Sequence, residues 1–278
     1  MACKLFVLAL CLASCHATSL RCNFKYNNNQ DYYCEGSITT TKNDYTVDAL
    51  LGTHAQGRSN DDVYAVQFIG GSMEVLPKNL NTWFKNYREL TLFNITNFPN
   101  FKRSQWGEYK QLERLVFKGL PGVAVIPKDA LWDLTYLKVL YFEKMSNLQN
   151  FDGDFLSRFR SLTTFGVTSS PKITAIPNGF FRNQANSLQA VIFDGTNLRN
   201  ISYSAFSGLQ KLIIAKFMHA GCLDIAYNKS NIAKLTADIR KNCKDATIGR
   251  RNRILKKKNR VYSSSSSSSI NSSDSSDY

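Results

Sequence analysis

The amino-acid sequence predicts an α/β solenoid, in which about seven repeats of 24–26 residues each supply one short strand and one turn or short helix. The pattern apolar-x-x-apolar-x-apolar recurs at this spacing, starting at Val63, Tyr87, Leu112, Leu137, Leu162, Leu188 and Leu212. Two more apolar columns keep the same register at 25-residue steps: Phe101, Ile126, Phe151, Ile176 and Ile201, and Trp106, Leu131, Leu156, Phe181 and Phe206. Because one unit cannot cover its own apolar face, such units stack around a continuous core.

The cysteines are the third observation, because they fall where a stack of repeats needs its ends closed. Three of the seven cysteines precede residue 18, and the others form one close pair at each end of the remaining chain. Four cysteines allow three connectivities. The spacing favours the bridges Cys22–Cys34 and Cys222–Cys243. A metal site is the competing interpretation, but it would have only His54 and His219 and no Cys-x-x-Cys pair.

The repeat columns resemble the leucine-rich repeat family, whose strand motif matches the seven units of residues 63–220. Segments 125–127, 176–181 and 201–206 are similar to the convex halves of that family. The resemblance implies a horseshoe with a concave sheet. One departure is that the family's bridging Asn or Cys after the strand is replaced at all seven positions, whereas Asn97, Asn147 and Asn197 fall one or two positions late and could serve three units.

Both ends of such a stack need caps, so the sequence predicts an N-terminal cap (18–62), the repeats (63–220) and a C-terminal cap (221–249). The first cap is a small disulfide-closed unit followed by a strand-like segment, 37–51. In the second, Ile232, Leu235 and Ile239 recur at i, i+3 and i+7 and predict an amphipathic helix over 230–242. Each disulfide loop should contribute about 3 kcal/mol to stability. Both caps resemble those of extracellular leucine-rich repeat proteins.

The two ends of the chain differ in composition from the repeats. Residues 1–17 have the charged, apolar and small-residue order of a secretory signal peptide, which predicts a secreted, extracellular protein. No other stretch is apolar enough to predict a transmembrane segment. Residues 250–278 combine a basic run with serines and predict a disordered tail. The tail carries seven positive and two negative charges, so residues 18–249 account for only about +8 of the formal charge of +14.

The basic run has three interpretations. It is a soluble linker, a processing site with Arg-x-x-Arg spacing, or an electrostatic site for a polyanion such as a glycosaminoglycan. Specific nucleic-acid recognition is disfavoured, because no reading motif accompanies the charge. The polyanion candidates are Arg250, Arg251, Arg253, Lys256, Lys257, Lys258 and Arg260.

The sequence predicts no enzyme, no catalytic residues, no cofactor and no metal ion. It has no nucleophile elbow, phosphate loop or zinc-type His-Glu-x-x-His. With the cysteines bridged and His54 and His219 far apart in the repeat register, the sequence offers few residues that could form a catalytic Cys-His or Ser-His pair.

The outward positions of the predicted strands are the candidate binding surface, because strand side chains alternate between the two faces. Arg and Tyr, which often anchor protein interfaces, concentrate in the first four repeats. The predicted ligand-binding residues of this concave face are Tyr64, Gln67, Arg88, Glu89, Thr91, Glu113, Arg114, Lys138, Tyr141, Thr163, Gln189 and Lys216. Their ligand would be an extracellular protein or a carbohydrate.

Four Asn-x-Ser/Thr sequons predict glycosylation of a secreted chain, at Asn94, Asn200, Asn228 and Asn271. A glycan at Asn94 would restrict one rim of the concave face, whereas Asn200 lies in a convex half.

Taken with the resemblance, these features predict a secreted leucine-rich repeat protein that binds an extracellular protein or glycoconjugate through its concave sheet. The single-domain layout is similar to small extracellular leucine-rich repeat proteins of arthropods, which implies innate immune or cell-surface recognition. The alternative is an extracellular-matrix or adhesion protein that binds polyanions through its basic tail.

Overall fold

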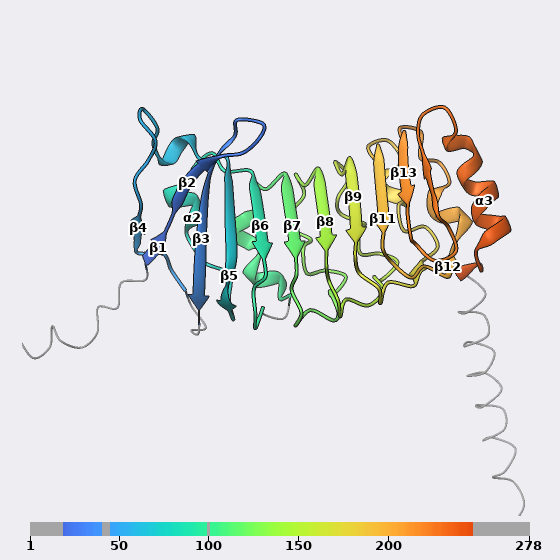
Figure 1. Ribbon diagram of the computed structural model, residues 1–278, viewed down its shortest axis with the longest axis horizontal. Helices are drawn as coiled ribbons and strands as arrows, with labels where there is room; N and C mark the ends of the chain where they lie inside the picture. The colour runs from blue at the N-terminus through green and yellow to red at the C-terminus, as the bar shows by residue number, and fades with distance from the viewer. Residues whose placement is uncertain (1–18, 41–44, 99–100, 247–278) are drawn as a thin grey trace, which may run out of the picture.

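The computed structural model describes residues 19–40, 45–98 and 101–246. The predicted signal segment, the basic residues of the tail and the sequon at Asn271 lie outside the described residues. Within the described part, ten strands form one continuous sheet that runs the length of the molecule (Figure 1). In that same part, no helix is long and apolar enough to cross a membrane.

The long sheet is parallel except at its two edges. Its strands are, in spatial order, β2 (Asn23–Tyr26), β3 (Tyr32–Thr40), β5 (Ala65–Met73), β6 (Glu89–Phe93), β7 (Arg114–Lys118), β8 (Val139–Glu143), β9 (Thr164–Thr168), β11 (Ala190–Asp194), β13 (Ile214–Phe217) and β14 (Ile225–Tyr227). Only the pairs β2–β3 and β13–β14 are antiparallel. In the parallel part, equivalent repeat positions lie opposite one another, as Leu90, Leu115 and Leu140 do. This topology confirms the predicted solenoid of leucine-rich repeats.

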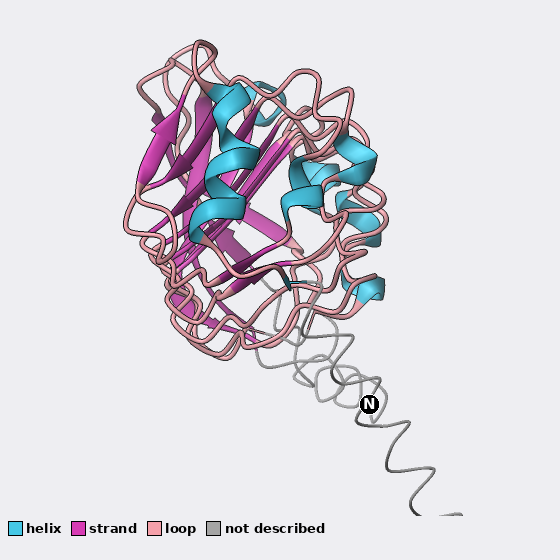
Figure 2. Ribbon diagram, turned by 90° about the vertical axis from the view of Figure 1, so that its right-hand side faces the viewer, coloured by secondary structure: helices cyan, strands magenta, loops and turns pink. Residues whose placement is uncertain are grey.

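The remaining elements connect the strands and close the ends of the stack. The helices are η1 (Asn60–Asp62), α2 (Leu80–Trp83), η2 (Arg103–Gln105), η3 (Gly107–Tyr109), η4 (Arg182–Gln184), η5 (Tyr203–Phe206), η6 (Ile232–Lys234) and α3 (Leu235–Asn242). Two small parallel sheets join β1 (Ser19–Arg21) to β4 (Ala49–Leu51) and β10 (Ala175–Ile176) to β12 (Asn200–Ile201). Figure 2 shows the short helices between the strands on one side of the long sheet. The other side, called here the open face, has no helix of the described residues lying over it.

The core between the sheet and the convex turns is rich in stacked phenylalanines. The rings of Phe117 and Phe142 are parallel with centroids 5.2 Å apart, and Phe142 contacts Phe165 at 6.2 Å. From the convex side, Phe151 and Phe180 pack against the ring of Phe165. Such pairs contribute about 0.5–1.5 kcal/mol each beyond the burial of their area. The aromatic residues therefore couple each repeat to the next.

A left-handed backbone turn recurs at the carboxyl ends of the strands and directs the chain toward the convex side. The residues in this column have φ angles between 49° and 70° and are Gly70, Asn94, Gly119, Lys144, Ser169, Gly195 and His219. Glycine and asparagine tolerate this conformation, whereas other residues lose about 1–2 kcal/mol in it. Lys144, Ser169 and His219 adopt this unfavourable conformation nonetheless. The left-handed turn is therefore a structural requirement of the repeat.

Asparagines replace the family's usual bridge between repeats in two of the three predicted units. Asn97 Nδ2 donates to Ser72 Oγ at 3.1 Å, and Asn147 Nδ2 donates to the backbone oxygen of Pro121 at 2.8 Å. The side chain of Asn197 instead accepts a long bond from nearby Arg199, within its own repeat. A serine has the bridging role in another unit, where buried Ser170 Oγ accepts the backbone N–H of Met145.

The two caps contain the predicted disulfides, which join Cys22 to Cys34 and Cys222 to Cys243. The expected strand over 37–51 is wrong in its bounds. In the structure β3 begins at Tyr32, because the β2–β3 hairpin is held by the first bridge and pairs with β5 as an additional strand of the sheet.

The predicted C-terminal helix is shorter than expected. Its first turn is the 3-10 helix η6 and only Leu235–Asn242 is α-helical, as is common at helix ends. The helix is joined to the edge strand, because Tyr227 Oη donates to Asp238 Oδ2 at 2.9 Å.

Candidate ligand-binding surface

The open face consists of the outward side chains of the long sheet. On β6, for example, Leu90 and Leu92 are buried while Glu89, Thr91 and Phe93 face outward. All twelve residues predicted for this face are partly or fully exposed, and they lie on the strands or directly before them. The structure therefore brings them onto one surface.

Pairs of opposite charges cross between neighbouring strands on the N-terminal half of this face. Glu113 and Lys138 are 2.8 Å apart, and Arg114 lies 3.7 Å from Glu89 on the adjacent strand. The hydrogen bond to Glu113 raises the pKa of the Lys138 ammonium. These side chains are exposed to solvent, which screens the charges, so each pair contributes little to stability. Their main effect is to neutralise one another on the surface.

Tyr141 occupies the centre of the face because the next strand has a glycine opposite it. A β-carbon at Gly166 would overlap the Tyr141 ring, so the ring lies over the bare backbone of β9. The Arg114 guanidinium lies 5.8 Å from the ring centroid, within cation–π range. Burial raises the pKa of the Tyr141 hydroxyl. Arg114 is thus held by Glu89 on one side and Tyr141 on the other.

A third row of outward residues was missed by the sequence prediction. Lys118 Nζ lies 3.0 Å from Glu143 on β8 and 5.1 Å from the ring centroid of Phe93 on β6. The predicted motif stopped at its last apolar residue, whereas each of these strands extends one residue further. Alternation of strand side chains, continued by one position, would have found the row.

Two predicted residues of the first repeats have environments that differ from the charged pairs. Arg88 Nη1 donates to the backbone oxygen of Tyr87 at 2.9 Å, so this guanidinium folds back onto its own turn. Burial raises the pKa of the Tyr64 hydroxyl, and nearby Glu89 and Glu113 raise it further. Burial likewise raises the pKa of the Glu89 carboxyl, against the opposing effect of Arg114.

The C-terminal half of the open face is apolar instead of charged. Ile213 and Ile214 are 39% and 36% exposed, and Ile192 is partly exposed on the neighbouring strand. Ala190, opposite Ile214 in the strand register, leaves the adjoining surface shallow. The predicted contact residues of this half are Thr163, Gln189 and Lys216. The exposed Lys216 lies between Ile192 and Ala226 in the strand register. The open face is therefore divided into a self-neutralised half and an apolar half.

Of the three predicted glycosylation sites among the described residues, two follow strands of the long sheet and one lies on the convex side. Asn94 is exposed in the left-handed turn after β6, and Asn228 follows the edge strand β14, where its Oδ1 accepts bonds from the N–H and hydroxyl of Ser230. Asn200 is part of β12 on the convex side. Whether each carries a glycan stays a prediction.

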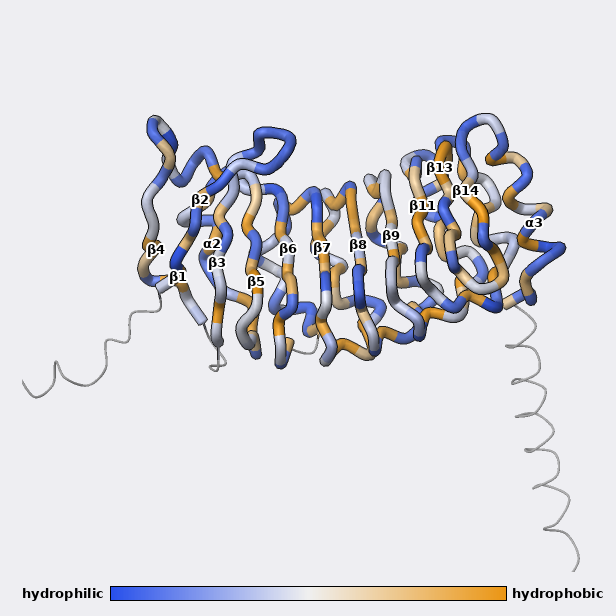
Figure 3. The backbone as a smooth tube through the Cα atoms, in the orientation of Figure 1, coloured by the Kyte–Doolittle hydropathy of each residue, from blue (hydrophilic) through white to orange (hydrophobic). Residues whose placement is uncertain are grey.

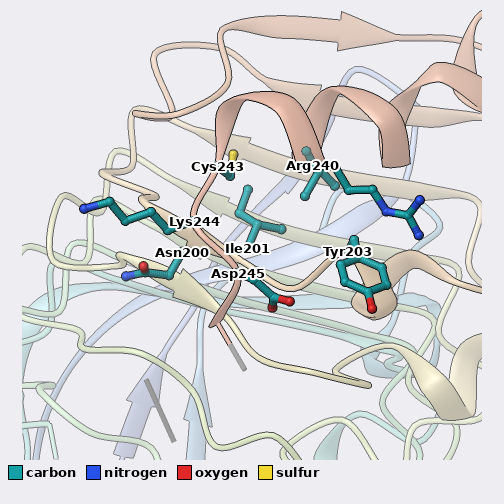
Figure 4. Close-up of a pocket in the computed structure, with 8 residues that line it drawn as sticks. Asn200, Ile201, Tyr203, Arg240, Cys243, Lys244 and Asp245 are labelled. Carbon is teal, nitrogen blue, oxygen red and sulfur yellow. The ribbon is translucent and has the colours of Figure 1, made fainter. Parts of the chain in front are cut away.

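A cavity of about 630 Å³ lies beneath α3 at the C-terminal cap and is separate from the open face. Figure 4 shows its lining, which includes Asn200, Tyr203 and Lys244. The Arg240 guanidinium lies 4.5 Å from the ring centroid of Tyr203 and covers that ring. The disulfide at Cys243 closes one side, so this cavity belongs to the contact between the cap and the last repeat.

The two described histidines belong to different ends of the sheet. His54 is packed in the N-terminal cap, where its ring stacks on Phe24 with centroids 3.8 Å apart and its Nε2 is 2.8 Å from Asn60 Oδ1. His219 follows β13 and lies 3.7 Å from Asp194. Among the described residues, no group of three or more His, Cys, Asp or Glu side chains could hold a metal ion.

Comparisons with known proteins match the chain by structure alone. No protein-family model and no curated protein matches the sequence. A chain from the Toll–Spätzle complex of Drosophila superposes with a TM-score of 0.49 and 12% identity, covering 64% of this chain and 23% of that one. A chain of the TLR13–ssRNA13 complex has a TM-score of 0.40 and 14% identity, covering 56% of this chain and 25% of that one.

The leucine-rich repeat ectodomain of the receptor kinase SOBIR1 from Arabidopsis thaliana has a TM-score of 0.33 and 18% identity, covering 71% of this chain and 94% of that one. This chain thus spans about a quarter of the length of the first two matched chains. The parallel sheet and the 25-residue register define the fold independently of these likenesses.

Proposed function

We propose that this protein is a secreted binding protein that captures an extracellular macromolecule on its open face and catalyses no reaction. The observation that carries the proposal is the face itself, a surface of parallel strands with regular outward rows and no covering element among the described residues. Stacked repeats generate extended surfaces of this kind, and repeat proteins use them for binding.

The compartment is supported by the cysteines. Both cap disulfides are formed in the structure, and such bridges persist mainly in oxidising environments such as the extracellular space. We propose recognition at a cell surface or in innate immunity as the setting of this binding.

A steric block of the face tests the proposal better than charge reversal. Reversing Arg114 or Lys138 would also place like charges beside Glu89 or Glu113 and would disturb the surface itself. The double substitution V116N/K118T instead creates a sequon at the centre of β7. A glycan there would cover the open face while leaving the buried residues of that strand unchanged.

The matched control is D152N/D154T, which creates a sequon of the same kind at two exposed convex residues. Both variants and the wild type are secreted from eukaryotic cells, their glycan occupancy is measured by mass spectrometry, and partners are captured from native extracellular fluid. We expect the β7 glycan to abolish capture of the partner that the wild type and the convex variant retain. Equal capture by both glycosylated variants would refute binding on the open face.

A further inference from the structure

The open face has an apolar area at its C-terminal end that the ion-paired residues do not reach. We define the isoleucine patch as Ile192, Ile213, Ile214 and Ala226 surrounding Lys216. The strand register places Ala190 opposite Ile214, Ile192 opposite Lys216, and Lys216 opposite Ala226. Directly opposed outward side chains are in contact range, so Ile192, Lys216 and Ala226 form one continuous surface. Ile214 continues it at the start of β13, and the exposed Ile213 directly precedes that strand. Figure 3 shows the hydrophobic segments of β13 and β14 at this end of the sheet.

Isoleucine is unusual on an uncovered sheet face. The two isoleucines at the start of β13 keep more than a third of their surface accessible. Exposed apolar surface that is contiguous and bordered by polar groups commonly marks a binding site, whereas single exposed residues need no explanation. The helix α3 does not cover this patch, because it packs at the end of the stack against η5 and η6. A partner is therefore the element that would remove these side chains from water.

Lys216 gives the patch a charge that its neighbours do not compensate. Elsewhere on the face the cations Lys25, Arg114, Lys118 and Lys138 each have a carboxylate within 4 Å, and Arg88 donates to the backbone oxygen of Tyr87. Among the described residues, Lys216 has no ion pair. The two acids near the end of β13 interact with His219. Asp194 lies beside the His219 ring, and Asp224 accepts the backbone N–H of His219. A partner carboxylate would complement Lys216 and become partly desolvated among the isoleucines.

We propose that the isoleucine patch binds an extended polypeptide segment that places apolar side chains around one Asp or Glu carboxylate. This inference rests on the proposed function and names its partner class. A carbohydrate is the poorer fit, because the patch offers isoleucine and alanine where a sugar would need hydrogen-bonding groups for its hydroxyls. The small side chains of Ala190 and Ala226 leave room for an extended chain on this surface, and an aliphatic surface next to one ammonium suits apolar side chains next to one carboxylate.

The test uses a phage-displayed library of random 12-residue peptides, selected on the full-length oxidised protein. We expect the enriched peptides to contain one acidic residue between apolar residues. Their affinity, measured by biolayer interferometry, should fall at least tenfold on K216E and on I214D. The matched control K128E changes an exposed lysine on the convex side and should leave affinity within twofold of wild type. Thermal unfolding of each variant confirms that the fold is intact.

A charge exchange gives the most specific readout. Replacing the acidic residue of an enriched peptide by Lys should abolish binding to the wild type and restore binding to K216E. Enrichment of no peptide, enrichment without the acidic-apolar pattern, or equal binding to K216E and wild type would each overturn the proposal. Dimerisation of the wild type that K216E abolishes would assign the patch to a second copy of the chain and would also overturn it.

The outcome can be separated from that of the proposed function. If the glycan on β7 abolishes capture of the native partner while K216E and I214D capture it normally, the open face is the binding surface and the isoleucine patch is not its centre. If the β7 glycan has no effect either, both proposals fail.

Discussion

Gly119 offers a direct test of the recurring left-handed turn. Its φ is 63°, and a β-carbon added there would overlap the side-chain oxygen of Asn94 in the preceding repeat. Alanine in this conformation loses about 1–2 kcal/mol, partly offset by about 0.4–1 kcal/mol from the less flexible unfolded chain. Because the overlap with Asn94 adds to the loss, we expect G119A to lower the free energy of unfolding by about 1–2 kcal/mol.

The matched control lies three residues away in the same turn region. Gly122 has open space around its α-carbon and no left-handed backbone, so G122A should be neutral or stabilise the fold by up to about 1 kcal/mol. The two variants should therefore differ by about 1–3 kcal/mol and, at about 2–4 °C per kcal/mol for a chain of this size, melt roughly 2–12 °C apart in circular dichroism. Equal melting temperatures would refute the left-handed turn as a structural requirement of the repeat.

Three further predictions concern Glu89, the C-terminal disulfide and the basic tail. Burial raises the pKa of Glu89, so the folded state binds the proton more tightly than the unfolded chain. E89Q should therefore be more stable than wild type in urea at pH 7, and the difference in unfolding free energy should shrink as the pH falls through about 4.5. A difference that grows toward acid pH would contradict this. Removing the C-terminal bridge by C222S/C243S, which opens a loop with a sequence separation of 21, should lower the free energy of unfolding by about 3 kcal/mol, whereas an unchanged denaturation midpoint would show that the cap is stable without it. A chain ending at Gly249 should elute from heparin at lower salt than the full chain if the basic tail binds polyanions, and unchanged retention would exclude the tail as that site.

The repeat architecture could be predicted from the sequence because the packing rule is periodic. Leu90, Leu115 and Leu140 recur at 25-residue spacing, and a spacing this regular requires equivalent positions to lie opposite one another in a sheet. The same argument found the outward residues, since side chains alternate along each strand. The cysteine pairs marked the two ends of the stack.

The chemistry of the open face could not be predicted at the same level. Whether Glu113 meets Lys138 or solvent depends on side-chain geometry across two repeats, which spacing alone does not determine. Gly166 lies opposite Tyr141, and only the structure shows that the Tyr141 ring covers its backbone. As a result, the charged residues that seemed the best anchors are largely neutralised by one another, and the free apolar surface lies in later repeats.

The left-handed turn was present in the sequence but obscured. Gly119 and Gly195 share one repeat column with Asn94, all residues that tolerate positive φ. Lys144 and Ser169 occupy the same column. Because neither residue type indicates a left-handed backbone, the column is difficult to recognise from the sequence. Local preference is overridden there by the packing of the repeats on either side.

The most direct test of the central claim is hydroxyl-radical footprinting of the wild-type protein with and without the partner captured from native extracellular fluid. If the partner binds the open face, oxidation of Tyr64, Tyr141 and Ile214 should fall in the complex. Tyr136, which is 65% exposed, and Tyr203, which lies in η5 under Arg240 of the C-terminal cap, should be oxidised at the same rate in both states. Protection of Tyr203 with unchanged oxidation of Tyr141 and Ile214 would contradict the account and place the partner on the cap.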